Sequence, residues 1–211
     1  MSGPHSQCVG QTFLSAPDHE QAVVGPPIEC DAATLESLHT MTQRIYTIGH
    51  STRELDEFVG LLRENGIERL ADIRRYPGSR RYPHFSRDSL ARTLPQIGIE
   101  YVHIPELGGR RKPSPDSRNT AWRNDQFRAY ADHMSTDEFR HTVDSLIADY
   151  RVTAVMCAEA VPWRCHRNLL SDDLVRRGIE VVHILAPGST RLHEMNPHAR
   201  VIPGAVIYPR V

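Results

Sequence analysis

The stretch between residues 155 and 170 concentrates side chains that can do chemistry. Its sequence, VMCAEAVPWRCHRNLL, starts with an apolar run and then brings two thiols, a carboxylate, an imidazole and two guanidinium groups. These groups belong to Cys157, Glu159, Arg164, Cys165, His166 and Arg167. Such residues occur in metal centres, in sites with a thiol nucleophile, and in acid–base sites beside an anion clamp.

A metal centre is the first alternative. Cys157, Cys165 and His166 are zinc-ligand types, and His50 from another strand end could complete a set of four. Seven residues separate the two cysteines, however, whereas structural zinc sites usually have about two to four. His166 also follows Cys165 directly, which makes joint ligation from the start of a helix awkward. The spacing therefore predicts no metal ligand and assigns no cofactor, with a metal-dependent hydrolase as an open alternative.

A thiol nucleophile is the second alternative. Cys165 is expected near the N-terminus of a helix and beside basic side chains, a setting that lowers the pKa of a thiol. Phosphatases and sulfurtransferases use a strand-to-helix loop in which an arginine follows the cysteine at a fixed short distance. Here Trp163 stands at that distance from Cys157, and Arg164 comes one residue too late. Cys165 is therefore the predicted reactive thiol, and Cys157 is either a second nucleophile or a packed core residue.

Acid–base chemistry beside an anion clamp is the third alternative. Glu159 lies two residues beyond Cys157, where the chain leaves a predicted strand. A partly buried carboxylate at such a place can act as an acid or a base, although Glu159 could instead form an ion pair with Arg164 or Arg167. The other acid–base candidates share a position at a predicted strand end or helix start; they are His166, His50 and Asp72.

Arginines outnumber carboxylates in the middle of the chain. Residues 69–128 hold 12 Arg and 1 Lys against 6 acidic residues. The planar guanidinium group suits bidentate contacts with phosphate or carboxylate, and a glycine lets a ligand approach the backbone closely. The predicted anion-binding residues are Arg74, Arg75, Arg80, Arg81, Gly108, Gly109, Arg110, Arg164 and Arg167.

The same region interleaves arginine with aromatic residues. RRYPGSRRYPHF, residues 74–85, contains Tyr76, Tyr82 and Phe85 among its arginines. Arginine for phosphate and aromatic rings for stacking are typical of single-strand or nucleotide binding, although a pI near 6.9 is far from strongly basic. The sequence contains no glycine-rich dinucleotide fingerprint and no P-loop. The expected partner is therefore an anionic small molecule or a nucleic acid.

The elements that must position these residues alternate along the chain. Strands are predicted at 44–50, 67–74, 99–105, 151–159 and 179–185, with a further candidate at 205–209, and helices at 51–66, 86–98, 126–149 and 165–178. This alternation predicts an α/β fold, a single domain with a mainly parallel open sheet of about five or six strands and helices on both faces. The carboxyl ends of parallel strands meet at one sheet edge, so the candidate residues should converge there.

Three serines are predicted to cap helices. Ser51 with Glu54, and Ser135 with Glu138, match the capping-box pattern, and the second box divides the third helical stretch into two helices. Ser86 is a candidate cap for the second helix.

Residues 1–43 differ in composition from the rest of the chain. They hold five acidic residues and no Lys or Arg, and they are rich in Pro, Gly and Ser. They are predicted to be an acidic, flexible extension before the α/β domain at 44–211. No apolar run reaches the roughly 18 residues of a transmembrane helix, and the first residues lack the features of a secretion signal. A cytoplasmic protein with reduced cysteines and no membrane partner is expected.

Several sequence blocks, in this order, resemble the family catalogued as domain of unknown function 488. The blocks are YTIGHSTRELDEFVGLL, DIRRYPGSRRYPHFS, YVHIPELGGRR, FRAYADHM, VMCAEAVPWRCHR and GIEVVHI. The resemblance covers approximately residues 44–186. It implies an α/β fold, a bacterial cytoplasmic protein and a pocket built from these blocks, but no particular reaction.

Together these features predict an enzyme, a hydrolase or transferase, that acts on a phosphorylated or nucleic-acid-related substrate. Its arginine-rich pocket should lie at the carboxyl ends of the strands. The residues expected to do chemistry are Glu159, His166, Cys165, Cys157, His50 and Asp72. A non-catalytic nucleotide or nucleic-acid binding module is the main alternative.

Overall fold

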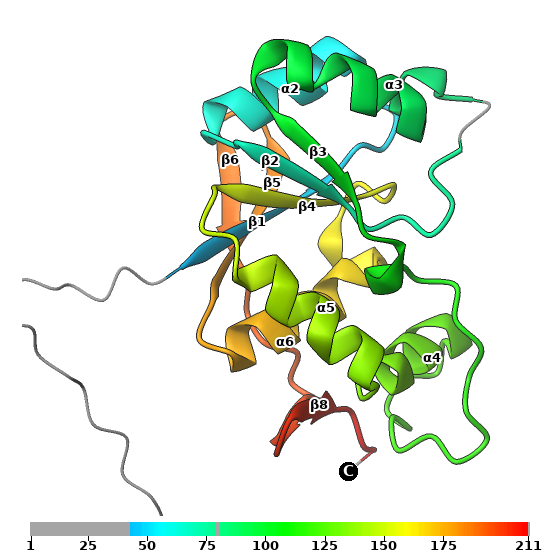
Figure 1. The fold of residues 1–211 in the computed structure, drawn as a ribbon. Helices are drawn as coiled ribbons and strands as arrows, with labels where there is room; N and C mark the ends of the chain where they lie inside the picture. The colour runs from blue at the N-terminus through cyan, green and yellow to red at the C-terminus, as the bar shows by residue number, and fades with distance from the viewer. Residues whose placement is uncertain (1–42, 79–80, 211) are drawn as a thin grey trace, which may run out of the picture. The chain divides into compact units, whose positions relative to one another are not determined.

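A six-stranded sheet forms the centre of the fold in the computed structural model, which describes residues 43–78 and 81–210 (Figure 1). The strands are β1 (Arg44–Gly49), β2 (Arg69–Asp72), β3 (Glu100–His103), β4 (Thr153–Cys157), β5 (Glu180–Ala186) and β6 (Ser189–Leu192). Their order is β3–β2–β4–β1–β5–β6, and every neighbouring pair is parallel except β5 with β6. Residues 1–42, nearly all of the predicted extension, and the predicted anion-binding residue Arg80 lie outside the described residues.

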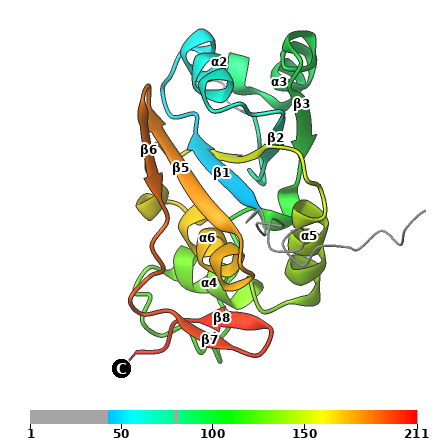
Figure 2. The same ribbon diagram turned by 90° about the vertical axis from the view of Figure 1, so that its left-hand side faces the viewer.

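Helices cover both faces of the sheet, as Figure 2 shows from a second direction. They are α2 (Leu55–Glu64) and α3 (Arg87–Thr93) on one face, and α4 (Asp125–His133), α5 (Asp137–Ile147) and α6 (Arg167–Arg176) on the other. In β4 every residue is buried, because Ala154 and Met156 pack toward α2 while Val155 and Cys157 pack toward α6. The predicted α/β fold is confirmed. None of the helices in the described part of the chain is long and apolar enough to cross a membrane.

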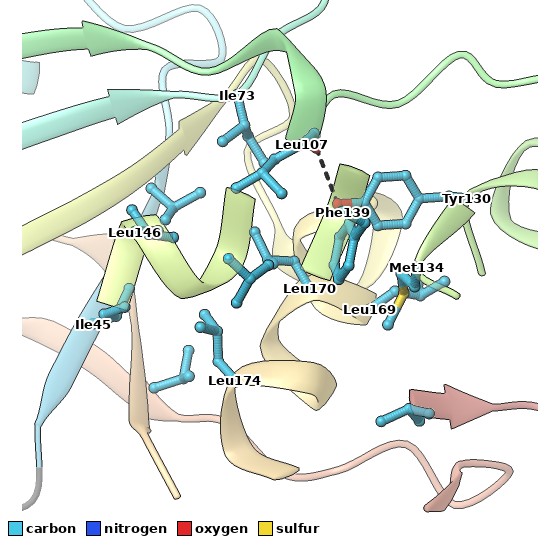
Figure 3. Packing of buried hydrophobic residues seen from close by; sticks show 14 of the residues in the cluster. Ile45, Ile73, Leu107, Tyr130, Met134, Phe139, Leu146, Leu169, Leu170 and Leu174 are labelled. Atoms are coloured by element: carbon cyan, nitrogen blue, oxygen red, sulfur yellow. Dashed lines mark hydrogen bonds between the residues drawn. The ribbon is translucent and has the colours of Figure 1, made fainter. Parts of the chain in front are cut away.

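The larger of two apolar clusters lies between the sheet and helices α4, α5 and α6 (Figure 3). Its Tyr130 ring is fully buried, and the Tyr130 hydroxyl donates a hydrogen bond to the carbonyl oxygen of Leu107, 3.0 Å away. Leu169, Leu170 and Leu174 bring α6 into the same cluster. Each large apolar side chain buried in this way contributes about 1.5–3 kcal/mol. The cluster therefore holds α6, and the loop that precedes it, against the sheet.

The chain leaves two adjacent strands toward opposite faces of the sheet. After β1 it continues into α2 on one face, whereas after β4 it continues into α6 on the other. The two strands pair in parallel, and Gly49 is opposite Cys157 at their carboxyl ends. Connections that diverge in this way open a crevice at which α/β proteins bind ligands. The fold therefore places the expected ligand site at this edge of the sheet.

Gly49 lets the loop after β4 pack directly on the end of β1. The backbone N–H of Ser51 donates a hydrogen bond to the carbonyl oxygen of Ala158, 2.9 Å away. A Cβ atom at position 49 would lie 1.7 Å from the carbonyl oxygen of Glu159, far closer than two non-bonded atoms can approach. Only glycine is compatible with this contact.

Both predicted capping boxes are wrong. Ser51 has a left-handed backbone, φ 51°, and the N-cap of α2 is Glu54, which makes no side-chain cap bond. At α5 the capping residue is Thr136, whose hydroxyl accepts the N–H of Phe139, and not the preceding Ser135. A capping pattern is a short local signal. At Ser51 it is overridden by the contact between this segment and the loop after β4.

The strand predicted at 205–209 does not join the main sheet. β8 (Ala205–Ile207) pairs with β7 (Arg200–Ile202) in a separate antiparallel hairpin. The sixth strand of the main sheet is β6, whose residues are all exposed. Its sequence lacks the apolar–polar alternation that identifies a half-buried strand, so it was not predicted. The cap predicted at Ser86 is confirmed, because its hydroxyl accepts the N–H of Ser89.

Gly49→Ala is expected to lower the free energy of unfolding by roughly 3 kcal/mol, because the added methyl group forces β1 and the loop after β4 apart. Gly60→Ala is the matched control. A Cβ atom at this α2 position meets nothing within 4 Å, and alanine should raise the helix stability by about 0.5–1 kcal/mol. Chemical denaturation of both variants measures the difference, and equal stabilities would contradict the packing described.

Candidate functional site

A pocket of about 330 Å³ opens at the carboxyl edge of the sheet. Segments that follow β2, β3 and β4 line it, together with the start of α4. From the residues predicted to do chemistry, the pocket brings together Cys157, Glu159, Cys165 and His166. From the residues predicted to bind an anion, it brings together Arg74, Arg75, Gly109, Arg110 and Arg164.

Cys157, Cys165 and His166 form a compact group, called here the thiol cluster. Their potential ligand atoms all lie within 4.8 Å of one another. The two Sγ atoms are 2.9 Å apart, and Nδ1 of His166 lies 3.7 Å from Sγ of Cys165. Both cysteines are free and buried, and the His166 ring packs on that of Tyr130 with 4.8 Å between the ring centroids.

Arg167 fixes the shape of the loop between β4 and α6. Its side chain is only 1% exposed. Nη2 donates a hydrogen bond to the carbonyl oxygen of Glu159 at 2.6 Å, and Nη1 donates one to the hydroxyl oxygen of Thr47 at 3.3 Å. The backbone N–H of Arg167 points to Sγ of Cys165 at 3.4 Å. Among the described residues, no carboxylate lies within 4.0 Å of this guanidinium, whose side chain does not line the pocket.

The two thiols of the cluster differ in acidity. Burial alone would raise the pKa of the Cys165 thiol, but the hydrogen bond with Cys157, the Arg167 charge and the Arg167 backbone N–H lower that pKa to about 6. The hydrogen bond with Cys165, together with burial, raises the pKa of Cys157 well above its usual range. Burial lowers the pKa of His166. At neutral pH the cluster therefore holds a thiolate on Cys165, a thiol on Cys157 and a neutral imidazole.

Three pocket arginines have no carboxylate partner in the part of the chain that the structure describes. These are Arg75, Arg110 and Arg164, and all three are exposed. Arg74 differs from them because it is buried and its Nη2 lies 2.6 Å from Oδ2 of Asp72. Arg110 also has a left-handed backbone, φ 59°, which is unfavourable for a residue other than glycine and is concentrated at functional sites. The pocket rim therefore offers positive charge to an anion.

Asp72 and His50 lie beneath the pocket and hold Arg74 in place. Asp72 accepts hydrogen bonds from Nε and Nη2 of Arg74, and a further one from the Tyr101 hydroxyl at 2.8 Å. His50 Nε2 lies 3.1 Å from Nη1 of Arg74. Burial and the charge of Arg74 lower the pKa of His50 to about 4, so its imidazole is neutral at pH 7. Both residues position an arginine, and neither lines the pocket.

Arg81 and Gly108 also lie outside the pocket lining. The Arg81 guanidinium lies over the Tyr82 ring, 5.5 Å from its centroid. At Gly108 an added Cβ atom would meet the backbone of Ile73 and Arg75 at 2.9 Å. This glycine therefore serves the packing of the segments after β2 and β3, where the sequence predicted a contact with a ligand.

One side of the pocket comes from residues that the sequence analysis missed. Asn124, Gln126 and Phe127, at the start of α4, also line the pocket. The only sequence signal was Asn124, a favoured N-cap type, whose side chain accepts the N–H of Gln126 at 2.8 Å. A cap pattern predicts where a helix begins. It does not predict that this helix end lies against the strand ends.

The fold and the pocket define an α/β protein with a thiol cluster at one edge of its sheet, beside arginines that form no ion pair within the described residues. The family model described as domain of unknown function DUF488 matches residues 54–174, more than half of the chain, and the protein belongs to this family. The resemblance of the sequence blocks is thereby confirmed, and the matched segment contains every residue that lines the pocket. Comparisons with curated proteins and with solved structures returned no match.

Alkylation of Cys165 is expected to follow a pKa of about 6, because the thiolate is the reactive form. Its labelling rate should rise as the pH passes about 6 and level off above about 7, while Cys157 should react slowly throughout. Brief iodoacetamide treatment in EDTA, followed by peptide mass spectrometry, measures both rates. A Cys165 labelling midpoint above about pH 8 would contradict the assignment, whereas burial alone would slow the labelling without moving its midpoint.

Proposed function

We propose that this protein is an enzyme that acts on a phosphorylated, nucleotide-class substrate bound in the pocket. The observation that carries the proposal is the surplus of positive charge next to the thiol cluster. Arg75, Arg110 and Arg164 border the same pocket and form no ion pair within the described residues. A phosphate group would supply the missing acceptor oxygens, because the arginine fork forms bidentate contacts with it.

Tyr76 supports a substrate that also carries a planar ring. Its side chain is 65% exposed, and the guanidinium carbons of Arg75 and Arg110 each lie 6.0 Å from the ring centroid. An exposed aromatic ring flanked by cations offers a stacking surface to a base while the arginines contact phosphate. The cavity of about 330 Å³ also lies within the range of small-molecule sites, roughly 300–1,000 Å³.

Groups that can carry out a reaction share the pocket with the arginines. The thiol cluster offers sulfur and imidazole, and Glu159 is exposed with no ion pair in the described chain. Glu159 or His166 could accept or deliver a proton, and Cys165 could attack an electrophilic centre. This set of groups supports a hydrolase or a transferase.

Non-catalytic binding of a nucleotide or a single-stranded nucleic acid is the second candidate function. The exposed ring of Tyr76 between two arginines favours it as much as it favours catalysis. The two functions differ in their need for the carboxylate of Glu159. An enzyme requires it as a proton acceptor, whereas a binding module does not.

Arg110→Ala and Arg164→Ala are each expected to weaken the binding of a nucleoside diphosphate by about tenfold or more, because each removes charged contacts to phosphate. Isothermal titration calorimetry with the common nucleoside diphosphates, one at a time, measures the change. Arg81→Ala is the matched control, because it removes an exposed arginine of the same basic region that does not line the pocket. The proposal is wrong if no diphosphate binds, or if the control loses as much affinity.

Glu159→Gln distinguishes the enzyme from the binding module. The amide keeps the size of the side chain but cannot accept a proton, so turnover should fall by about 100-fold with little change in affinity. Chromatography of the bound nucleotide after incubation measures turnover. A wild-type protein that binds a nucleotide and leaves it unchanged would overturn the enzyme and leave the binding module.

A further inference from the structure

The thiol cluster has the composition and arrangement of a metal site. We propose that Cys157, Cys165 and His166 bind one divalent transition-metal ion of the zinc class, with the remaining coordination position open to the pocket. Thiolate and imidazole are ligands that zinc favours, and three protein ligands with one open position is the arrangement of catalytic zinc sites. A catalytic role for the ion rests on the proposed function, whereas its binding does not.

One of two distances in the cluster is close to that around a tetrahedral ion, and the other is shorter. With zinc–sulfur and zinc–nitrogen bonds of about 2.3 and 2.0 Å, two sulfur ligands lie about 3.8 Å apart and a sulfur and a nitrogen about 3.5 Å apart. Nδ1 of His166 lies 3.7 Å from Sγ of Cys165, close to the second value. The Sγ atoms of Cys157 and Cys165 are 2.9 Å apart, so an ion would have to separate them by roughly 1 Å.

Neighbouring groups contact two of the three ligands, Cys165 and His166. The backbone N–H of Arg167 points to Sγ of Cys165 at 3.4 Å, as donors commonly do toward a metal-bound thiolate. The Tyr130 ring lies against the imidazole of His166. On another side, the backbone of Gly109 approaches so closely that an added Cβ atom would be 3.0 Å from Nδ1. The imidazole therefore lies between the Tyr130 ring and the Gly109 backbone, with Nδ1 directed toward Sγ of Cys165.

The path of the loop explains why the sequence spacing argued against a metal. Short cysteine spacings are typical of sites in which a single turn carries both ligands. Here Cys157 ends β4 and Cys165 directly follows the 3-10 turn Pro162–Arg164. The N–H of Cys165 donates a hydrogen bond to the carbonyl oxygen of Pro162, 2.9 Å away, and the chain folds back over the strand end. Ligands on a strand end and on a facing helix start need no short spacing.

The fourth coordination position faces the substrate site. His50, the fourth ligand considered from the sequence, is not in the cluster, because its ring nitrogens contact Arg74 and the carbonyl oxygen of Ser51. The side of the cluster toward the pocket carries no further protein ligand among the described residues. Water or a substrate oxygen could therefore occupy that position.

Cobalt(II) titration of the full-length, chelator-treated, reduced protein tests the site. A sulfur-to-cobalt charge-transfer absorption should develop and saturate at about one equivalent, and zinc should abolish it. Cys157→Ser, Cys165→Ser and His166→Ala should each weaken cobalt binding by about tenfold or more. Circular dichroism of each variant separates a lost ligand from a lost fold, and the wild-type titration stands independently of the variants.

The matched control is the double variant Cys8→Ser, Cys30→Ser, which removes the two cysteines outside the described residues and should keep full cobalt binding. The site is refuted by the absence of charge-transfer absorption in the wild type, by an unchanged cobalt affinity in Cys157→Ser, or by loss of the absorption in the double variant. Nucleoside diphosphate binding to the metal-free protein keeps the two proposals distinct. Nucleotide binding without cobalt absorption refutes only the metal site, and cobalt absorption without nucleotide binding refutes only the proposed function.

Discussion

The buried guanidinium of Arg167, which has no carboxylate partner among the described residues, determines the shape of the candidate site. The guanidinium of Arg167 lies in the interior, where an uncompensated charge is unfavourable by several kcal/mol. The guanidinium donates hydrogen bonds to the carbonyl oxygen of Glu159 and to the hydroxyl oxygen of Thr47. The loop after β4 must therefore wrap around this side chain. The Arg167 charge also favours negative charge on the neighbouring Cys165. After the hydrogen bond with Cys157, the Arg167 charge is the next cause of the low pKa of the Cys165 thiol.

The hydroxyl of Thr47 links Arg167 to a second buried polar chain. Thr47 Oγ1 lies 2.7 Å from Nδ1 of His183, and Nε2 of His183 lies 3.0 Å from Nδ1 of His193. Asp172 is the last member of this hydrogen-bonded series, with Oδ1 lying 2.8 Å from Nε2 of His193. Oδ2 of Asp172 accepts a further hydrogen bond from the Tyr208 hydroxyl at 2.7 Å. Burial, then the proximity of His193, lowers the pKa of His183 to about 3, so this ring stays neutral at pH 7. A fully partnered network of this kind fixes α6 relative to β1 and β5.

The alternation of strand and helix patterns was sufficient to predict the α/β fold, because the five parallel strands and the helices each carry an apolar signal, whereas the exposed strand β6 does not. The parallel sheet predicts that the candidate residues meet at one edge, but His50 and Asp72 do not line the pocket there. The roles of individual arginines could not be predicted, since Arg164 and Arg167 stand three positions apart, yet one is exposed at the pocket and the other is buried. The contact between Cys157 and Cys165 depends on the path of a loop, and the histidines of the buried chain come together only through the pairing of distant segments. Neither the contact between the two cysteines nor the contacts among these histidines can be predicted from a short stretch of sequence.

The most direct measurement is the ultraviolet titration of the Cys165 thiolate in EDTA, in a protein that lacks Cys8 and Cys30, with and without the Arg167 charge. The structure predicts a midpoint near pH 6 for the parent protein, with a similar value in Arg167→Lys, which keeps a positive charge. In Arg167→Met the midpoint should rise by at least about one pH unit, since the compensating charge is gone. An unchanged midpoint in a folded Arg167→Met protein would contradict the dependence of the site on this buried arginine.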